Sequence, residues 1–196
     1  FYTMAAPLTN REVFEVMRGP DGNTDEGAME TLTSLDLTEL AQTLMETEAF
    51  STAVEALPGT WEVRALTHAE WLAAREQKKI ELNMGFTERL ADAPSSNHRG
   101  AMMDGRPRPN ELLGPASSQM AAIAVHPRNP DITAMASVPH DRPLPNVVAR
   151  LALTPIRMDE AIRVPNDTDV WRNVRTELLW TTVLGIIPSF LIPILR

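Results

Sequence analysis

Residues Leu178 to Leu195 read LLWTTVLGIIPSFLIPIL, a run of 18 residues without a charged side chain. As a helix this run would extend about 27 Å, close to the hydrocarbon thickness of a bilayer. A helix packed on a soluble core normally has a polar face, whereas the polar residues here are only Thr181, Thr182 and Ser189. The run therefore predicts a single transmembrane helix, with an in-plane or half-spanning insertion as the alternative.

The flanks of this run indicate an orientation. Arg172 and Arg175 precede it and Arg196 alone follows it, and these interfacial arginines place the larger N-terminal part on the matrix or stromal side by the positive-inside rule. The chain begins Phe1-Tyr2-Thr3, which fits either a removed organellar transit peptide or a start that the sequence does not include. The expected anchor consists of the large apolar side chains of the run: Leu178, Leu179, Trp180, Val183, Leu184, Ile186, Ile187, Phe190, Leu191, Ile192, Ile194 and Leu195.

Charge is distributed unevenly over the 196 residues. The net charge is −8 overall, but residues 1–92 contain 17 acidic and 7 basic side chains, whereas residues 93–196 contain 9 acidic and 11 basic ones. An acidic chain does not favour nucleic acid as a partner, because phosphate binding needs an excess of Lys and Arg. The chain has no cysteine, which excludes disulfides, thiolate nucleophiles and zinc–thiolate sites.

The acidic half has the apolar spacing of helices. Thr9 or Asn10 is expected to cap a short helix that stops at Gly19-Pro20. Two capping boxes, Asp36 with Glu39 and Thr67 with Glu70, predict two further helices, the second reaching Met84, with Leu90 as its outermost limit. The apolar stripe of the helix that begins at Asp36 continues through Phe50 to Leu57 and ends at Pro58-Gly59, and Trp61 to Leu66 is too short and mixed to assign.

Proline dominates the middle of the chain. Thirteen of the 16 prolines follow residue 92, too closely spaced for a long helix. Two short apolar runs, Met120 to Val125 and Val147 to Leu153, fit either strands or single helical turns. The prediction is a mainly α chain: a small acidic helical domain (1–92), a Pro-rich extended segment that lies on another protein (93–166), and a juxtamembrane and transmembrane helix (167–196).

Sequence motifs give no catalytic or cofactor site. Phosphate-binding glycine loops and nucleophile elbows are absent from the sequence. His68-Ala69-Glu70 matches half of a zinc deaminase signature whose other half needs two cysteines, and His98, His126 and His140 are scattered. We therefore expect no enzyme activity, no cofactor, no metal site and no small-molecule substrate.

A partial calcium-loop pattern occurs at residues 21–25, DGNTD, which resembles the start of an EF-hand loop. Glu26 stands where that loop needs glycine, and Leu32 replaces the bidentate glutamate. The pattern fits an acidic turn, or an EF-hand shape without its ion, better than a working calcium site.

These features predict a non-catalytic accessory subunit of a large organellar membrane complex, acting in its assembly and stability. Its partners would be the other subunits and the lipid bilayer. A mitochondrial respiratory-chain complex or the ATP synthase fits best, which places the protein in the mitochondrial inner membrane. The alternatives are a thylakoid photosystem subunit, and a membrane-anchored binding or regulatory module with a degenerate EF-hand-like domain.

Overall fold

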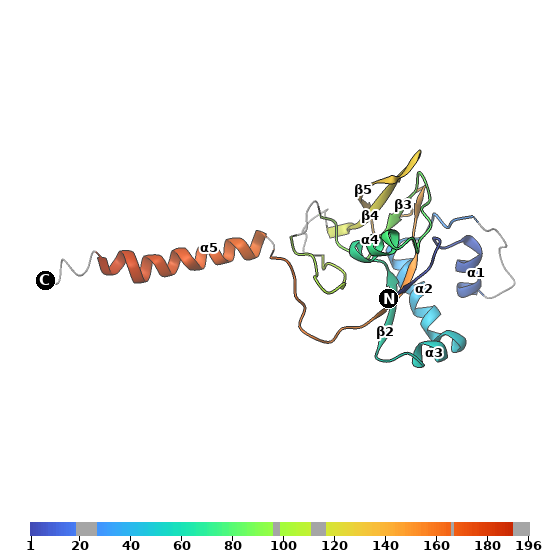
Figure 1. The fold of residues 1–196 in the computed structure, drawn as a ribbon, viewed down its shortest axis with the longest axis horizontal. Coiled ribbons are helices and arrows are strands. Elements are labelled where there is room, and N and C mark those ends of the chain that lie inside the picture. The colour runs from blue at the N-terminus through green and yellow to red at the C-terminus, as the bar shows by residue number, and fades with distance from the viewer. Residues whose placement is uncertain (19–26, 96–98, 111–116, 166, 190–196) are drawn as a thin grey trace.

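Two β-sheets with helices packed against them form the body of the protein, and a long C-terminal helix extends away from it (Figure 1). The computed structural model describes residues 1–18, 27–95, 99–110, 117–165 and 167–189. The helices are α1 (Asn10–Arg18), α2 (Ser34–Glu46), α3 (Glu48–Glu55), α4 (His68–Glu76) and α5 (Asp167–Thr181), which continues through a π-helical turn (Thr182–Ile186). The strands are β1 (Tyr2–Thr3), β2 (Trp61–Ala65), β3 (Thr87–Arg89), β4 (Gln119–His126), β5 (Asn129–Pro139), β6 (Val147–Val148) and β7 (Leu151–Pro155).

The first sheet has the order β1-β7-β2, and the second has the order β5-β4-β3-β6. All neighbouring strands are antiparallel except β3 and β6, which pair in parallel. Only Ala149 and Arg150 separate β6 from β7, and both are fully buried. The chain thus crosses from one sheet to the other in the centre of the body.

Threonine caps set the starts of two helices. The hydroxyls of Thr33 and Thr67 accept hydrogen bonds from the backbone N–H groups three residues later, and Asp36 and Glu70 accept in return from the cap backbone. The predicted box at Thr67 is confirmed. The predicted box of Asp36 with Glu39 is wrong by one turn, because Asp36 is the third helical residue rather than the cap.

The helix predicted to run from Thr67 towards Leu90 is much shorter. It ends at Glu76, and Lys78 has a positive φ of 52° that no α-helix continues through. The chain then reaches β3, so Leu90 is buried beside a strand in the cluster that surrounds Trp71. Apolar spacing alone did not separate these two environments.

The expectation of a mainly α chain with an extended Pro-rich middle is wrong, because the protein is mixed α/β. Strands β4 to β7 all come from that middle segment, and the two short apolar runs within it are strands. Four of its prolines lie at strand ends or in a turn: Pro127 is in the β4–β5 turn, Pro130 is the second residue of β5, and Pro139 and Pro155 end β5 and β7. These are positions where a missing N–H removes no ladder bond.

The predicted transmembrane helix is also contradicted. Among the described residues, no helix combines enough length with enough apolar residues to cross a bilayer. Within the helix that begins at Asp167, the polar first half contributes nothing to such a span, and the apolar part is described only from Leu178 to Ser189, roughly 18 Å of helix. This overturns the membrane-protein assignment and the single-pass placement in the mitochondrial inner membrane or the thylakoid.

A buried ion pair joins the two sheets. Arg150 Nε donates to Glu88 Oε1 at 2.6 Å and Arg150 Nη2 donates to Glu88 Oε2 at 3.0 Å, while the indole N–H of Trp71 donates to Glu88 Oε2 at 3.0 Å. The remaining guanidinium donors of Arg150 bind backbone carbonyls of Met4, Ala5 and Glu81. The network holds the N-terminal segment, α4 and both sheets together.

Candidate functional site

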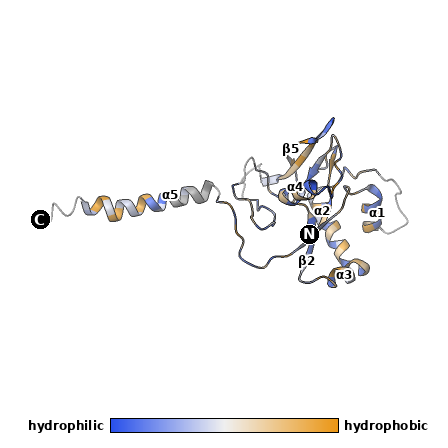
Figure 2. Cartoon of the chain, viewed as in Figure 1, coloured by the Kyte–Doolittle hydropathy of each residue, from blue (hydrophilic) through white to orange (hydrophobic). Residues whose placement is uncertain are grey.

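The C-terminal helix presents large apolar side chains to solvent. Leu184 is 69% exposed, and Leu178 is 62% exposed. Figure 2 shows the apolar residues gathered toward the far end of the helix, away from the body. Exposed apolar surface of this extent on a single chain marks a site of association. The exposed large apolar residues of the helix are Trp171, Val174, Leu178, Leu179, Trp180, Val183, Leu184, Ile186 and Ile187.

The residues predicted to anchor the chain fall in two groups. Those from Leu178 to Ile187 lie on this exposed helix, whereas Phe190, Leu191, Ile192, Ile194 and Leu195 lie outside the described residues. Of the predicted interfacial arginines, Arg175 is exposed on α5. The side chain of Arg172 and all of Arg196 are outside the described part.

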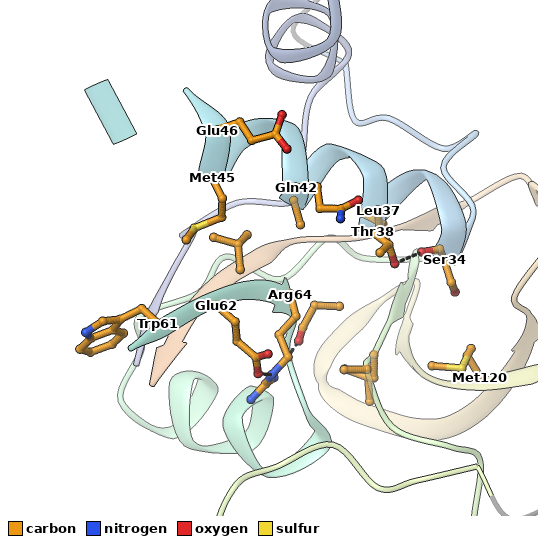
Figure 3. A pocket seen from close by; sticks show the side chains of 15 residues that line it. Ser34, Leu37, Thr38, Gln42, Met45, Glu46, Trp61, Glu62, Arg64 and Met120 are labelled. Atoms are coloured by element: carbon orange, nitrogen blue, oxygen red, sulfur yellow. Dashed lines mark hydrogen bonds and ion pairs between the residues drawn. The ribbon is translucent and has the colours of Figure 1, made fainter. Parts of the chain in front are cut away.

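A pocket of about 590 Å³ lies between α2 and β2 (Figure 3), and we call it the α2–β2 pocket. Its volume is in the range of small-molecule and side-chain binding sites. Met45 and Trp61 lie at one end, and Ser34 and Met120 at the other. The full lining is Ser34, Leu37, Thr38, Ala41, Gln42, Met45, Glu46, Trp61, Glu62, Val63, Arg64, Ala65, Leu90, Ala91 and Met120.

Arg64, the basic side chain of this pocket, is paired with Glu62 of the pocket and with Glu70 beside it. Arg64 donates to both oxygens of Glu70 at 2.8 and 2.9 Å and to Glu62 Oε1 at 3.0 Å. Burial alone would lower the pKa of Arg64, but the hydrogen bonds and charges of Glu70 and Glu62 outweigh it and raise that pKa. Arg64 therefore stays charged and bound to its partners, and the pocket can take an apolar group beneath a polar rim.

A second pocket of about 450 Å³ lies at the start of α4, and we call it the α4 pocket. It brings together His68, Ser95 and Asp92 with Arg106 and Arg108. Asp92 Oδ2 accepts a hydrogen bond of 2.6 Å from the backbone N–H of His68, and Oδ1 accepts one of 2.6 Å from the backbone N–H of Arg108. A histidine and a carboxylate thus share a pocket, and the carboxylate binds the backbone at the first residue of α4.

The environment of Asp92 disfavours its charge. Burial raises the pKa of the Asp92 carboxyl, and the two backbone hydrogen bonds together with the charges of His68 and Arg64 offset this only in part. Both oxygens of the carboxylate are engaged with N–H donors. Asp92 therefore links the N-terminus of α4 to the loop that contains Arg108 through hydrogen bonds to both.

The other residues singled out in the sequence lie apart. His126 is at the β4–β5 turn, where its Nδ1 accepts from the N–H of Arg128, and His140 follows β5. His98 and the calcium-like stretch 21–25 lie outside the described residues. Within the described ranges, no group of three or more His, Asp or Glu side chains is placed to hold a metal ion.

Sequence reasoning missed the residues that shape both pockets. Asp92 and Arg64 have no local motif, and their roles come from partners brought close by the fold: Asp92 with the N–H of Arg108, and Arg64 with Glu70. The usable signal is the capping box of Thr67 with Glu70, since it fixes the start of the helix that lines the α4 pocket and carries Glu70, the partner of Arg64.

Comparison of the chain with protein-family models, with curated proteins and with solved structures gives no match. Function must therefore be inferred from the geometry itself.

Proposed function

We propose that this protein is a non-catalytic subunit of a larger protein assembly, in which it acts in assembly and stability, and that its partners are other protein subunits. The observation that carries the proposal is the C-terminal helix, whose large side chains, such as Leu178 and Leu184, are exposed in the single chain. A helix that is apolar on every side is normally buried. A neighbouring subunit that encloses residues 178–187 would supply that burial.

The rest of the molecule supports a role as a structural subunit. The body has its own core, centred on Trp71, Leu40 and Val138 in three clusters, so it can fold before its helix finds a partner. Both pockets consist largely of apolar residues and of charged groups engaged within the chain, such as Arg64 with Glu70. A binding and assembly role needs no more chemistry than this.

The test compares two leucines of equal exposure. Leu178 on α5 and Leu35 on α2 are both 62% exposed, so Leu178→Glu and Leu35→Glu make the same chemical change at two places on the surface. Cells that lack the chain would receive wild type, Leu178→Glu or Leu35→Glu. Native gel separation and mass spectrometry would then measure the size of the complex and its subunits.

We expect wild type and Leu35→Glu to migrate with a complex far heavier than the 21.7 kDa chain, and to restore its amount. Leu178→Glu should leave a folded but unassembled chain, with an unchanged melting temperature, because Leu178 contributes nothing to the core. A wild-type chain that migrates alone, or a Leu178→Glu chain that assembles normally, would refute the proposal.

A further inference from the structure

Strand β5 is the edge of the larger sheet and is unusually long for an edge. It spans 11 residues, pairs with β4 on one side, and has no strand partner on the other side among the described residues (Figure 1). A long free edge presents unpaired N–H and C=O groups and invites pairing with another chain. Two of its large apolar side chains are also exposed, Ile132 at 53% and Met135 at 43%.

The hydrogen bonds of β4 show which backbone groups of β5 point away from β4. Ala121 and Val125 exchange backbone hydrogen bonds with the β3 side, so their N–H and C=O groups point away from β5. Their partners across the ladder are Ser137 and Thr133. In an antiparallel ladder, two residues that face each other without exchanging hydrogen bonds both direct their N–H and C=O groups away from the shared ladder. The backbone groups of Thr133 and Ser137 therefore point away from β4, and so do those of Met135, which faces Ile123 midway between them.

These outward groups have no partner in the described chain. The backbone N–H and C=O groups of Thr133, Met135 and Ser137 face away from β4 within the ladder, and they make no hydrogen bond outside it with any described residue. Between Ile132 and Val138 the strand itself has no charge and no proline that would protect the edge. The charged residue Asp131 lies just before this stretch, and Pro139 lies just after it. One charged side chain of α4 does reach this region: Arg75 donates to the Thr133 hydroxyl at 3.1 Å and to the Asp131 carbonyl at 2.7 Å.

The sequence of this stretch reads almost the same in both directions. Residues 132–138 are I-T-A-M-A-S-V, so β-branched Ile and Val, hydroxylic Thr and Ser, and two alanines are placed symmetrically about Met135. We propose that β5 pairs antiparallel with β5 of a second copy, with the two-fold axis passing between the two Met135 residues. A two-fold interface requires a surface that is complementary to itself, which this stretch provides.

The register that the symmetry dictates is the one that the backbone requires. Thr133 would face Ser137 of the second copy, and Met135 would face Met135. Residues whose backbone N–H and C=O groups point away from β4 would thus face residues of the same kind in the second copy. Each of these pairs can exchange both of its N–H···O bonds. Ala134 would face Ala136 of the second copy, whose small side chains allow close approach. The dimer joins the two larger sheets into one.

Single cysteines test the register, because the chain has none of its own. With Met135→Cys, the two introduced thiols would face each other at about 5.5 Å between Cα atoms, within disulfide range. With Ile132→Cys, the two would be about 20 Å apart along the strands. Ile132 is at least as exposed as Met135, so it is a matched control.

We expect mild oxidation of the full-length Met135→Cys chain to give several-fold more disulfide dimer than Ile132→Cys. Association through α5, or random collision, would cross-link both variants alike. Equal cross-linking, or no dimer of Met135→Cys, would overturn the proposal.

Charge substitution gives a second test that forms no covalent bond. Met135→Lys would place like charges opposite each other and weaken the dimer by up to about fivefold, as measured by sedimentation equilibrium. Mixing Met135→Lys with Met135→Glu should restore a dimer. Met158→Lys, at a residue that is 90% exposed and outside β5, should have no effect. A Met135→Lys chain that associates like wild type, or a mixture that stays monomeric, would contradict the pairing.

Discussion

The buried ion pair between Arg150 and Glu88 supports the sharpest stability prediction. Arg150 has no exposed surface, and its guanidinium donates to both oxygens of Glu88. Arg150→Met keeps much of the side-chain volume but leaves the Glu88 carboxylate buried without its cation. Breaking one partner of a buried pair costs about 3–5 kcal/mol of unfolding free energy. For a chain of this length, that loss corresponds to a melting temperature lower by about 6–20 °C.

A second substitution separates the charge from the packing. In the wild-type chain, Glu88→Gln should destabilise the protein, because it leaves the Arg150 cation buried without a counter-charge. In the Arg150→Met background the same Glu88→Gln change should stabilise it by about 1–3 kcal/mol, because it removes the uncompensated carboxylate. The indole N–H of Trp71 can still donate to the amide oxygen at position 88.

Wild type, Arg150→Met, Glu88→Gln and the double variant form a double-mutant cycle. Urea unfolding followed by circular dichroism would measure the unfolding free energy of all four proteins. Arg11→Met provides the control, since Arg11 and Glu15 form an exposed pair at 3.5 Å and its loss should change stability by less than about 0.5 kcal/mol. The reasoning is refuted if Arg150→Met costs less than about 1 kcal/mol, or if Glu88→Gln destabilises both backgrounds equally.

Two further predictions concern Asp92 and Thr33. The raised pKa of Asp92 means that its contribution to stability is fully present below the ordinary value of 3.8 and is lost as the pH rises through the folded value. The unfolding free energy of wild type minus that of Asp92→Asn should therefore fall between acid and neutral pH in urea titrations, and a difference that grows with pH would contradict it. Thr33→Ala should cost about 1 kcal/mol in thermal unfolding through loss of the α2 capping box, whereas Thr38→Ala, in the helix interior, should be neutral or stabilising.

The local signals in the sequence predicted the local structure well. Thr9 or Asn10 was expected to cap α1 and Thr67 to begin α4, and both helices start there, because a cap is made by residues within one turn. The apolar stripe from Phe50 to Leu57 is helical as expected, but it does not continue the helix that holds Asp36, because α2 ends at Glu46 and α3 begins at Glu48, on either side of Thr47. These elements need no distant partner to define their starts.

The sequence was misleading where distant residues decide the structure. The short runs Met120–Val125 and Val147–Leu153 become strands only because β3, β5 and β2 complete their ladders. Closely spaced prolines predict an extended chain lying on a partner, whereas Pro127, Pro139 and Pro155 lie in a turn or at strand ends within the body. The apolar run after Leu178 was interpreted as a membrane span, but the described helix is not long and apolar enough.

The sequence by itself thus determined the helix caps, the acidic character of residues 1–92, the absence of cysteine chemistry, and the self-complementary pattern around Met135. Only the tertiary structure decided that the chain is mixed α/β, that Arg150 and Glu88 meet 62 residues apart in the sequence, and that β5 is an edge strand among the described residues. The physical reason is range. A helix cap is made by residues within one turn of the chain, and composition is a property of the sequence itself. Strand pairing and buried ion pairs instead depend on which distant segments share a core.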